Sequence, residues 1–313
     1  MGVGVILGVD GGNSKTELLA ASVDGELLAL VRGGGSNSHA VGAEGTAEVI
    51  AGLLADARVE TPVDAAVFFL CGADVPGDVA ELEAAVAARR WARRARVDND
   101  TFALLRAGSE SEVAVAVICG SGINCVGRAG ARVVRYPSLG WETGDWGGSE
   151  MLGREAVFLA ARAEDGRGAP TELVEIVRSH FAAATVAELG ADVHYRRRSQ
   201  SSLGELAPLV VEAAARDATA GALVARLARE VALMVERAFR DLGVDEGDVV
   251  LGGGMLASGA GPLHDAVLAA LPDGAQPVVL RDPPVLGAAL AALDDVGADE
   301  AAKRRLREAV RAG

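Results

Sequence analysis

Residues 8–16 read Gly8-Val9-Asp10-Gly11-Gly12-Asn13-Ser14-Lys15-Thr16 and follow an apolar run, residues 3–7, with the character of a β-strand. A carboxylate, paired glycines and small hydroxyl residues therefore occupy a tight hairpin. Glycines let backbone N–H groups approach an anion closely, and the Ser-Lys-Thr end adds donors. The carboxylate repels phosphate but suits Mg²⁺, which favours oxygen ligands. The hairpin predicts a site for a nucleotide phosphate and its Mg²⁺, with Asp10 holding the ion through water.

The composition bounds the kind of protein and its partners. The 313 residues suffice for one large domain or two, and 50% of them are hydrophobic while only 4% are aromatic, so we expect a core of Ala, Val and Leu. A net charge of −14 argues against nucleic acids and anionic membranes as main partners. The three cysteines match neither a disulfide framework nor a zinc pattern, which favours the cytoplasm. We expect neither a leader nor a membrane span.

A pattern of strand, glycine turn, strand and strand occurs twice along the chain. The six strands are predicted at residues 3–9, 16–22, 27–33, 113–119, 124–128 and 132–136. We therefore expect two diverged copies of one unit, a domain over residues 1–110 and a second over 111–295 with a helical insertion. A last helix, 296–313, is expected to pack back on the first domain. A cleft between two such domains is a favoured place for ligands.

The basic run at residues 89–96 is the strongest cluster of positive charge in the amino-terminal third. It reads Arg-Arg-Trp-Ala-Arg-Arg-Ala-Arg and is predicted to be a solvated helix end or loop.

Glycine loops of a similar kind recur further along the chain. Gly120-Ser121-Gly122 follows the opening strand of the second copy, and Gly252-Gly253-Gly254-Met255 follows a short apolar strand at residues 249–251. Each loop alone could be an ordinary turn. The loops at Asp10 and at Gly120-Ser121-Gly122, however, follow equivalent strands, which favours a pair that holds the β- and γ-phosphates of a nucleotide. Neither loop of this pair is a Walker A loop or a Gly-x-Gly-x-x-Gly fingerprint before a helix. The run Gly252-Gly253-Gly254-Met255 is then expected to form the wall against which the nucleoside lies.

Polar clusters elsewhere indicate a second substrate with hydroxyl groups. Val97-Asp98-Asn99-Asp100 stands at a strand end and is either a helix N-cap or the source of a general base for an acceptor hydroxyl. Residues 140–149, Gly-Trp-Glu-Thr-Gly-Asp-Trp-Gly-Gly-Ser, are either a surface loop with Trp as core filler or a sugar-binding loop with an apolar wall and carboxylates. Ser36-Asn37-Ser38-His39 is either a plain loop or a further contact, with His39 as a structural hydrogen bonder.

The order of these motifs resembles the BadF/BadG-type ATPase family over nearly the whole chain. Within that family the chain is similar to the N-acetylglucosamine kinase branch, and more closely to actinobacterial glucosamine kinases. The resemblance implies an α/β fold of the actin/hexokinase/Hsp70 superfamily, with two ribonuclease-H-like domains that close on ATP and sugar. It also implies a sugar kinase that uses ATP and Mg²⁺.

The resemblance assigns roles residue by residue. Asp100 matches the catalytic base, and Asp10 matches the residue near Mg²⁺. The residues expected to bind ATP are Gly11, Gly12, Asn13, Ser14, Lys15, Thr16, Gly120, Ser121, Gly122, Gly253, Gly254 and Met255. The residues expected to bind the sugar are Asn37, Asp98, Asp100, Asn124, Glu142, Asp145 and Trp146.

Two departures from the family pattern bear on the sugar. The usual loop reads Gly-Asp-Glu-Gly-Ser, whereas here Trp146 replaces the Glu and a Gly is inserted, and Asp98 adds an acid beside the base. A 2-ammonium group favours carboxylates, and one charge pair at about 4 Å contributes about 1 kcal/mol in water and about 4 kcal/mol at an intermediate dielectric. Because Asp98, Glu142 and Asp145 could supply that field, we expect the acceptor to be glucosamine, phosphorylated at O6.

Other functions stay open at this point. The acceptor could be N-acetylglucosamine or another hexose. A radical-enzyme activator ATPase of the same family would need cysteines that bridge a dimer around an iron–sulfur cluster, whereas Cys119 and Cys125 flank a phosphate loop. A non-catalytic ATP-binding module of the superfamily would not need the Asn99-Asp100 pair. A homodimer is compatible with all of these readings.

Overall fold

The computed structural model describes residues 4–278 and 280–312, so Val3 of the first predicted strand lies outside the described residues. The chain forms two compact units. The first comprises Met1–Ala116 and Val278–Gly313, and the second comprises Val117–Pro277. The second domain was expected to span residues 111–295, whereas the second unit spans Val117–Pro277.

The first unit is built on a five-stranded mixed sheet. Its strands are β1 (Val5–Gly11), β2 (Lys15–Ser22), β3 (Leu27–Gly34), β4 (Val63–Leu70) and β5 (Ala92–Asn99), in the order β3-β2-β1-β4-β5. β1 and β2 form the predicted antiparallel hairpin. β4 is parallel to both β1 and β5. The carboxyl ends of β1, β4 and β5 therefore meet at one edge of the sheet.

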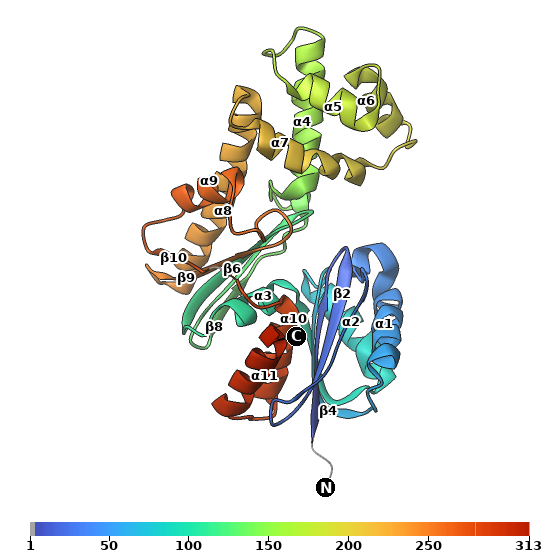
Figure 1. Ribbon diagram of the computed structural model, residues 1–313, viewed down its shortest axis with the longest axis vertical. Helices are drawn as coiled ribbons and strands as arrows, with labels where there is room; N and C mark the ends of the chain where they lie inside the picture. The colour runs from blue at the N-terminus through green and yellow to red at the C-terminus, as the bar shows by residue number, and fades with distance from the viewer. Residues whose placement is uncertain (1–3, 279, 313) are drawn as a thin grey trace. The chain divides into compact units, whose positions relative to one another are not determined.

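Helices cover both faces of this sheet, as Figure 1 shows. On one side lie α1 (Ser38–Ala57) and α2 (Pro76–Arg89), and on the other α3 (Thr101–Gly108), α10 (Pro284–Asp295) and α11 (Glu300–Ala312). Successive strand residues face opposite sides, so Leu7 packs in the core under α1 and α2 while Ile6 packs in the core with α10.

Helix α10 belongs with the first unit because it packs directly on β1. A Cβ atom built on Gly8 would overlap the backbone of Ala289, so only glycine permits this approach of helix and strand. The residues of α10 from Val285 to Leu293 are buried, which leaves the helix no polar face to mark it as an ordinary surface helix. Charged α11 is the last helix, which was expected to pack back on the first domain, and it completes this layer.

The basic run is a strand, and its prediction as a solvated helix end or loop was wrong beyond Arg90. Residues 92–99 form β5, at the edge of the sheet. Arg93 is 2.7 Å from Asp64, and Arg96 is 3.1 Å from Asp295. Exposed basic side chains are a common feature of edge strands, where they hinder pairing with other chains. Residues 93–96 of β5 are all exposed, so no apolar alternation marks this half of the strand in the sequence.

The second unit holds another five-stranded sheet, in the order β10-β9-β6-β7-β8. Its strands are β6 (Val113–Cys119), β7 (Ile123–Ala129), β8 (Arg132–Arg135), β9 (Gly247–Gly252) and β10 (Ala275–Val278). Its α-helices are α4 (Gly148–Glu164), α5 (Leu173–Phe181), α6 (Val186–His194), α7 (Ala207–Ala213), α8 (Ala218–Leu242) and α9 (Pro262–Ala270). Two 3₁₀ segments are Gly140–Glu142 and Gln200–Leu206.

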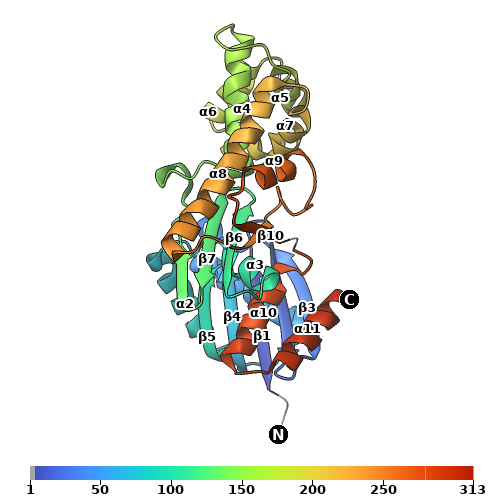
Figure 2. The same ribbon diagram turned by 90° about the vertical axis from the view of Figure 1, so that its left-hand side faces the viewer.

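The helices of the insertion pack beside α4. Figure 2 shows α5, α6 and α7 grouped beside α4, beyond the end of the sheet. The longest helix, α8, begins at the N-cap Asp217, whose carboxylate accepts a hydrogen bond of 2.8 Å from the backbone of Ala220. Within the described ranges, no helix has both the length and the apolar character that a membrane crossing requires.

Candidate active site

The structure brings Asp10 and Asp100 to the same edge of the first sheet. Asp10 is the penultimate residue of β1, and Asp100 directly follows β5. The parallel register aligns Asp10 with Phe69 and Leu70 with Asn99, so both carboxylates stand at the carboxyl ends of the strands. Two sequence motifs separated by ninety positions thus form one acidic edge.

Burial is the largest cause of the raised pKa of both carboxyl groups. Burial raises the pKa of Asp10 to about 7, with a further contribution from the charge of Glu17. Burial also raises the pKa of Asp100 to about 8, assisted by the charges of Asp10 and Asp74. The Cys71 thiol has its pKa raised by burial and by the same carboxylates, so it stays protonated.

Asp10 suits a Mg²⁺ ion, because a carboxylate oxygen is the kind of ligand that this ion favours. The charges of Asp10 and Asp74 add to burial in raising the pKa of Asp100, which means that each of them repels an ionised Asp100. A divalent cation at Asp10 would offset the repulsion between Asp10 and Asp100. Asp10 is next to the predicted phosphate hairpin.

The hairpin between β1 and β2 is closed by backbone hydrogen bonds and covered by the segment after β3. Gly12 N donates to Lys15 O at 2.8 Å, and Ser36 N donates to Gly12 O at 3.0 Å. Buried Thr16 donates its hydroxyl to Ser36 Oγ at 2.8 Å. Asn13, Ser14 and Lys15 at the tip are exposed. The tip therefore presents its donors while its base is held rigidly.

Lys15, a predicted phosphate donor, is held by a carboxylate that sequence reasoning missed. Its ammonium lies 2.8 Å from Glu17, and the guanidinium of Arg32 lies 2.6 Å from the other oxygen of the same carboxylate. Burial alone would raise the pKa of Glu17, but hydrogen bonds from Lys15 and Arg32 lower it below its usual range. The spacing of Lys15 and Glu17, two residues apart on one strand face, was the available signal.

Asn37 lies beside the phosphate hairpin in the same unit. It is the N-cap of α1, and its side-chain oxygen accepts a hydrogen bond of 3.0 Å from the backbone of His39. Its amide donates to Asn13 Oδ1 at 3.2 Å. The predicted sugar-binding residue is thus tied to a predicted phosphate-binding residue.

The Asn99-Asp100 pair stands at the start of α3. Asn99 Oδ1 accepts a hydrogen bond from Thr101 N at 2.9 Å. Asp98 accepts a hydrogen bond from Asn99 N at 2.8 Å. Burial and the neighbouring charges raise the pKa of the Asp100 carboxyl, and they outweigh the backbone N–H groups of Thr101 and Asp100, which lower that pKa.

Three motifs of the second unit converge on its glycine loop. Gly120 N donates to Gly122 O at 2.9 Å and closes the loop, while Ser149 N donates to Gly120 O at 2.8 Å. Met255 N donates to Cys119 O at 3.0 Å. The start of α4 and the predicted adenosine run therefore both lie against the second phosphate loop.

The two Trp residues of the loop before α4 were expected to form an apolar wall if the loop binds a sugar, but they differ in exposure. Trp146 is only 9% exposed, and the guanidinium of Arg226 lies 4.0 Å from its ring centroid. Its indole N–H has no hydrogen-bond partner among the described residues. Trp141, by contrast, is 69% exposed, and Glu142 is exposed as well.

Asn124 and Asp145, two predicted sugar-binding residues of the second unit, have polar neighbours, and Glu230 is near Asp145. Asn124 Oδ1 accepts a hydrogen bond of 2.8 Å from Ser138. Half-buried Asp145 accepts a hydrogen bond from Thr143. Burial raises the pKa of Glu230, Arg226 lowers it, and the charge of Asp145 raises it further. Arg226 and Glu230 come from α8, and no glycine motif or loop pattern could single them out.

The chain is similar to known proteins over most of its length. Residues 7–292 match the BadF/BadG/BcrA/BcrD ATPase family. An N-acetylmuramic acid/N-acetylglucosamine kinase of Clostridium acetobutylicum is 27% identical over 256 residues, which cover 79% of this chain and 83% of the relative.

Solved structures share the fold. A proposed N-acetylglucosamine kinase of Chromobacterium violaceum has a TM-score of 0.72 at 22% identity, with 92% of this chain and 98% of that chain covered. A ROK family glucokinase of Streptomyces griseus, in complex with glucose and AMPPNP, has a TM-score of 0.57 at 16% identity, with 93% and 100% covered. The predicted α/β fold of the actin/hexokinase class is confirmed.

Proposed function

Because this chain belongs to the BadF/BadG/BcrA/BcrD ATPase family, we propose that it transfers the γ-phosphoryl group of ATP to an amino sugar. The observation that carries the proposal is the pairing of Asp10 and Asp100 at the sheet edge, beside the phosphate hairpin. A kinase needs a metal-holding carboxylate and a base for the acceptor hydroxyl, and these two residues supply them. Burial of Cys119 and Cys125 favours the kinase over an activator ATPase that presents cysteines for a shared cluster.

The residues divide the work of phosphoryl transfer. Asp100 accepts the proton of the sugar hydroxyl, and its pKa of about 8 makes it a stronger base than an ordinary carboxylate. The exposed tip of the hairpin, residues 13–15, provides donors for phosphate oxygens. In the second unit, taken by itself, the loop at Gly120-Ser121-Gly122 is proposed for the same kind of role. Asp10 would hold the Mg²⁺ ion, which neutralises charge on the phosphates when bound.

Within the first unit we place the sugar beside Asn37, the residue next to the hairpin. The acceptor that we propose is glucosamine, phosphorylated at O6, because Asp98 adds a carboxylate two residues before the base. In the second unit, taken by itself, Asn124 and Asp145 are proposed as sugar-binding residues, and Glu230 adds a carboxylate near Asp145 that the sequence did not indicate. The Clostridium relative bears the name of a kinase for N-acetylated sugars, so an N-acetyl sugar is the competing acceptor.

Comparing kcat/KM for glucosamine, N-acetylglucosamine, N-acetylmuramic acid and glucose tests this assignment. We expect glucosamine to be favoured by about tenfold or more, because one partly screened charge pair contributes about 1 to 4 kcal/mol. The comparison is made at matched pH, with ADP release as the common readout. Equal values for glucosamine and glucose would remove the charge argument, and a preference for an N-acetyl sugar would assign the acceptor to that class.

A further inference from the structure

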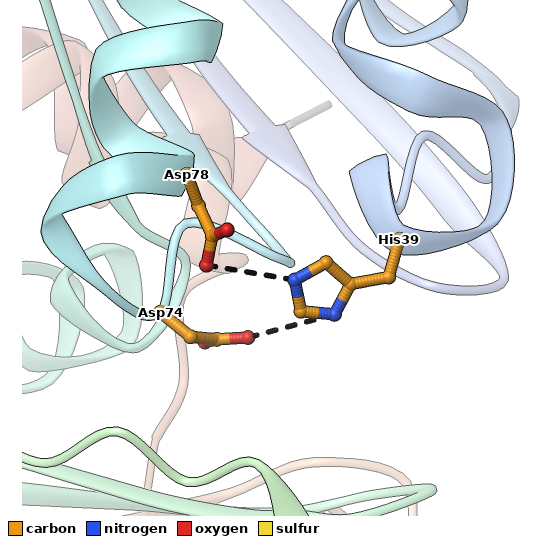
Figure 3. A group of neighbouring side chains, drawn as sticks. All are labelled: His39, Asp74 and Asp78. Carbon is orange, nitrogen blue, oxygen red and sulfur yellow. Dashed lines mark ion pairs between the residues drawn. The ribbon is translucent and has the colours of Figure 1, made fainter.

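A third carboxylate, Asp74, stands at the acidic edge without a role in the sequence analysis. It lies in the loop between β4 and α2, and its charge contributes to the raised pKa of Asp100. Figure 3 shows the imidazole of His39 between Asp74 and Asp78, with one carboxylate at each ring nitrogen. The separations are 3.9 Å to Asp74 and 3.5 Å to Asp78.

The three side chains are close enough to hold a metal ion, but their orientation favours a bridge. An ion takes one nitrogen of an imidazole, whereas here the carboxylates stand at opposite nitrogens. Protonated imidazole donates from both nitrogens and can pair with two carboxylates at once. Asp78 also accepts a hydrogen bond of 3.1 Å from Val75 N, which fixes it at the start of α2. His39 therefore ties α1 to the loop that carries Asp74.

From Asp74 the contacts lead directly to the catalytic segment. Asn99 donates its amide to Asp74 Oδ1 at 2.8 Å and, with only 3% of its surface exposed, has no room to turn away. The other end of the Asn99 amide accepts from Thr101 N at 2.9 Å. Both neighbours of Asp100 in the chain are thus fixed through one side chain that Asp74 orients.

We propose that Asp74 is a positioning residue for the acceptor reaction, holding Asn99 so that Asp100 faces the acceptor hydroxyl. His39 links Asp74 to the segment that carries Asn37, so the base and a sugar contact share one support. This inference rests on the proposed function, because it gives Asp100 the role of base.

The test compares Asp74→Asn and Asp74→Ala with the wild-type enzyme at one pH. Asp74→Asn keeps an oxygen for Asn99, so we expect kcat within about threefold of wild type. Asp74→Ala loses the acceptor oxygen, and we expect kcat to fall about tenfold while KM for ATP stays near wild type, because the hydrogen bond that orients Asn99 is gone.

Asp78→Ala is the matched control, because its carboxylate stands at the same histidine and accepts from Val75 N. Its kcat should stay within about threefold of wild type. Wild-type kcat in Asp74→Ala, a loss in Asp74→Asn as large as in Asp74→Ala, or an equal loss in Asp78→Ala would each overturn the inference. Asp100→Asn, measured in parallel, separates the two claims: if it retains turnover, the proposed base is wrong, and if it is inactive, only the role of Asp74 is in question.

Discussion

Replacing Asp100 by Asn lowers kcat by about two to four orders of magnitude, the usual size of a general-base contribution. The amide has the shape of the carboxylate but cannot accept the hydroxyl proton. KM for ATP should change less than kcat, because Asn keeps the shape of the side chain beside the hairpin. Steady-state ADP release with a saturating amino sugar measures the loss, and turnover within tenfold of wild type would contradict the assignment.

A folding defect is excluded by thermal unfolding of the same variant. The pKa of Asp100 is raised in the folded protein, so the folded state binds the proton more tightly than the unfolded chain. The stability that this proton contributes is lost as the pH rises from about 4 through about 8. Asn carries no such charge, so Asp100→Asn should melt at or above the wild-type temperature at pH 8. Asp56→Asn, an exposed change on α1, serves as the control for activity.

Replacing Gly148 by Ala destabilises the second unit by about 3 kcal/mol or more and raises KM for the sugar. Gly148 has φ of +77°, a region that costs a residue with a Cβ about 1–2 kcal/mol. A Cβ there would also overlap the carbonyl oxygen of Ser121 and the backbone of Gly122, which cannot move aside as a side chain could. The start of α4 and the second phosphate loop are therefore pushed apart.

Gly144→Ala is the matched control for this prediction. Gly144 has a similar φ of +82°, but nothing lies within 4 Å of a Cβ built there. Its substitution should cost only the backbone term of about 1–2 kcal/mol. Chemical denaturation of both variants measures the difference, and equal losses would show that the contact with Ser121 does not matter.

Much of the fold could be predicted because the decisive signals are local. The strands that lead to Asp10 and to Cys119 are continuous apolar runs followed by glycines, and both form as expected. Helix α10 is buried along most of its length, so its sequence shows no polar face and gives no indication of which sheet it covers. The end of β5 at Val97-Asp98-Asn99 was expected as a strand end, whereas its first half was not, because its exposed arginines conceal the strand.

The candidate site was predictable where glycines and strand-end acids mark it. Asp10 and Asp100 came from motifs, and parallel strands brought them together. The sequence did not single out Asp74, Glu17 or Glu230, because each is one acid without a motif around it. The partners of Asp74 and Glu230 are distant in the sequence. Glu17 has its partner Lys15 only two residues away, but that spacing is too common to stand out. Asp74 does follow the carboxyl end of a parallel strand, which is the signal that sequence reasoning could have used.

The most direct test of the central claim is the dependence of ADP release on a sugar hydroxyl. Wild-type enzyme with ATP and Mg²⁺ is mixed with glucosamine or with its 6-deoxy analogue, and ADP is measured together with the phosphorylated product by NMR. We expect stoichiometric ADP and 6-phosphate with glucosamine, and only background hydrolysis with the analogue. Equal ADP release with both compounds, or without sugar, would contradict a kinase whose base is Asp100.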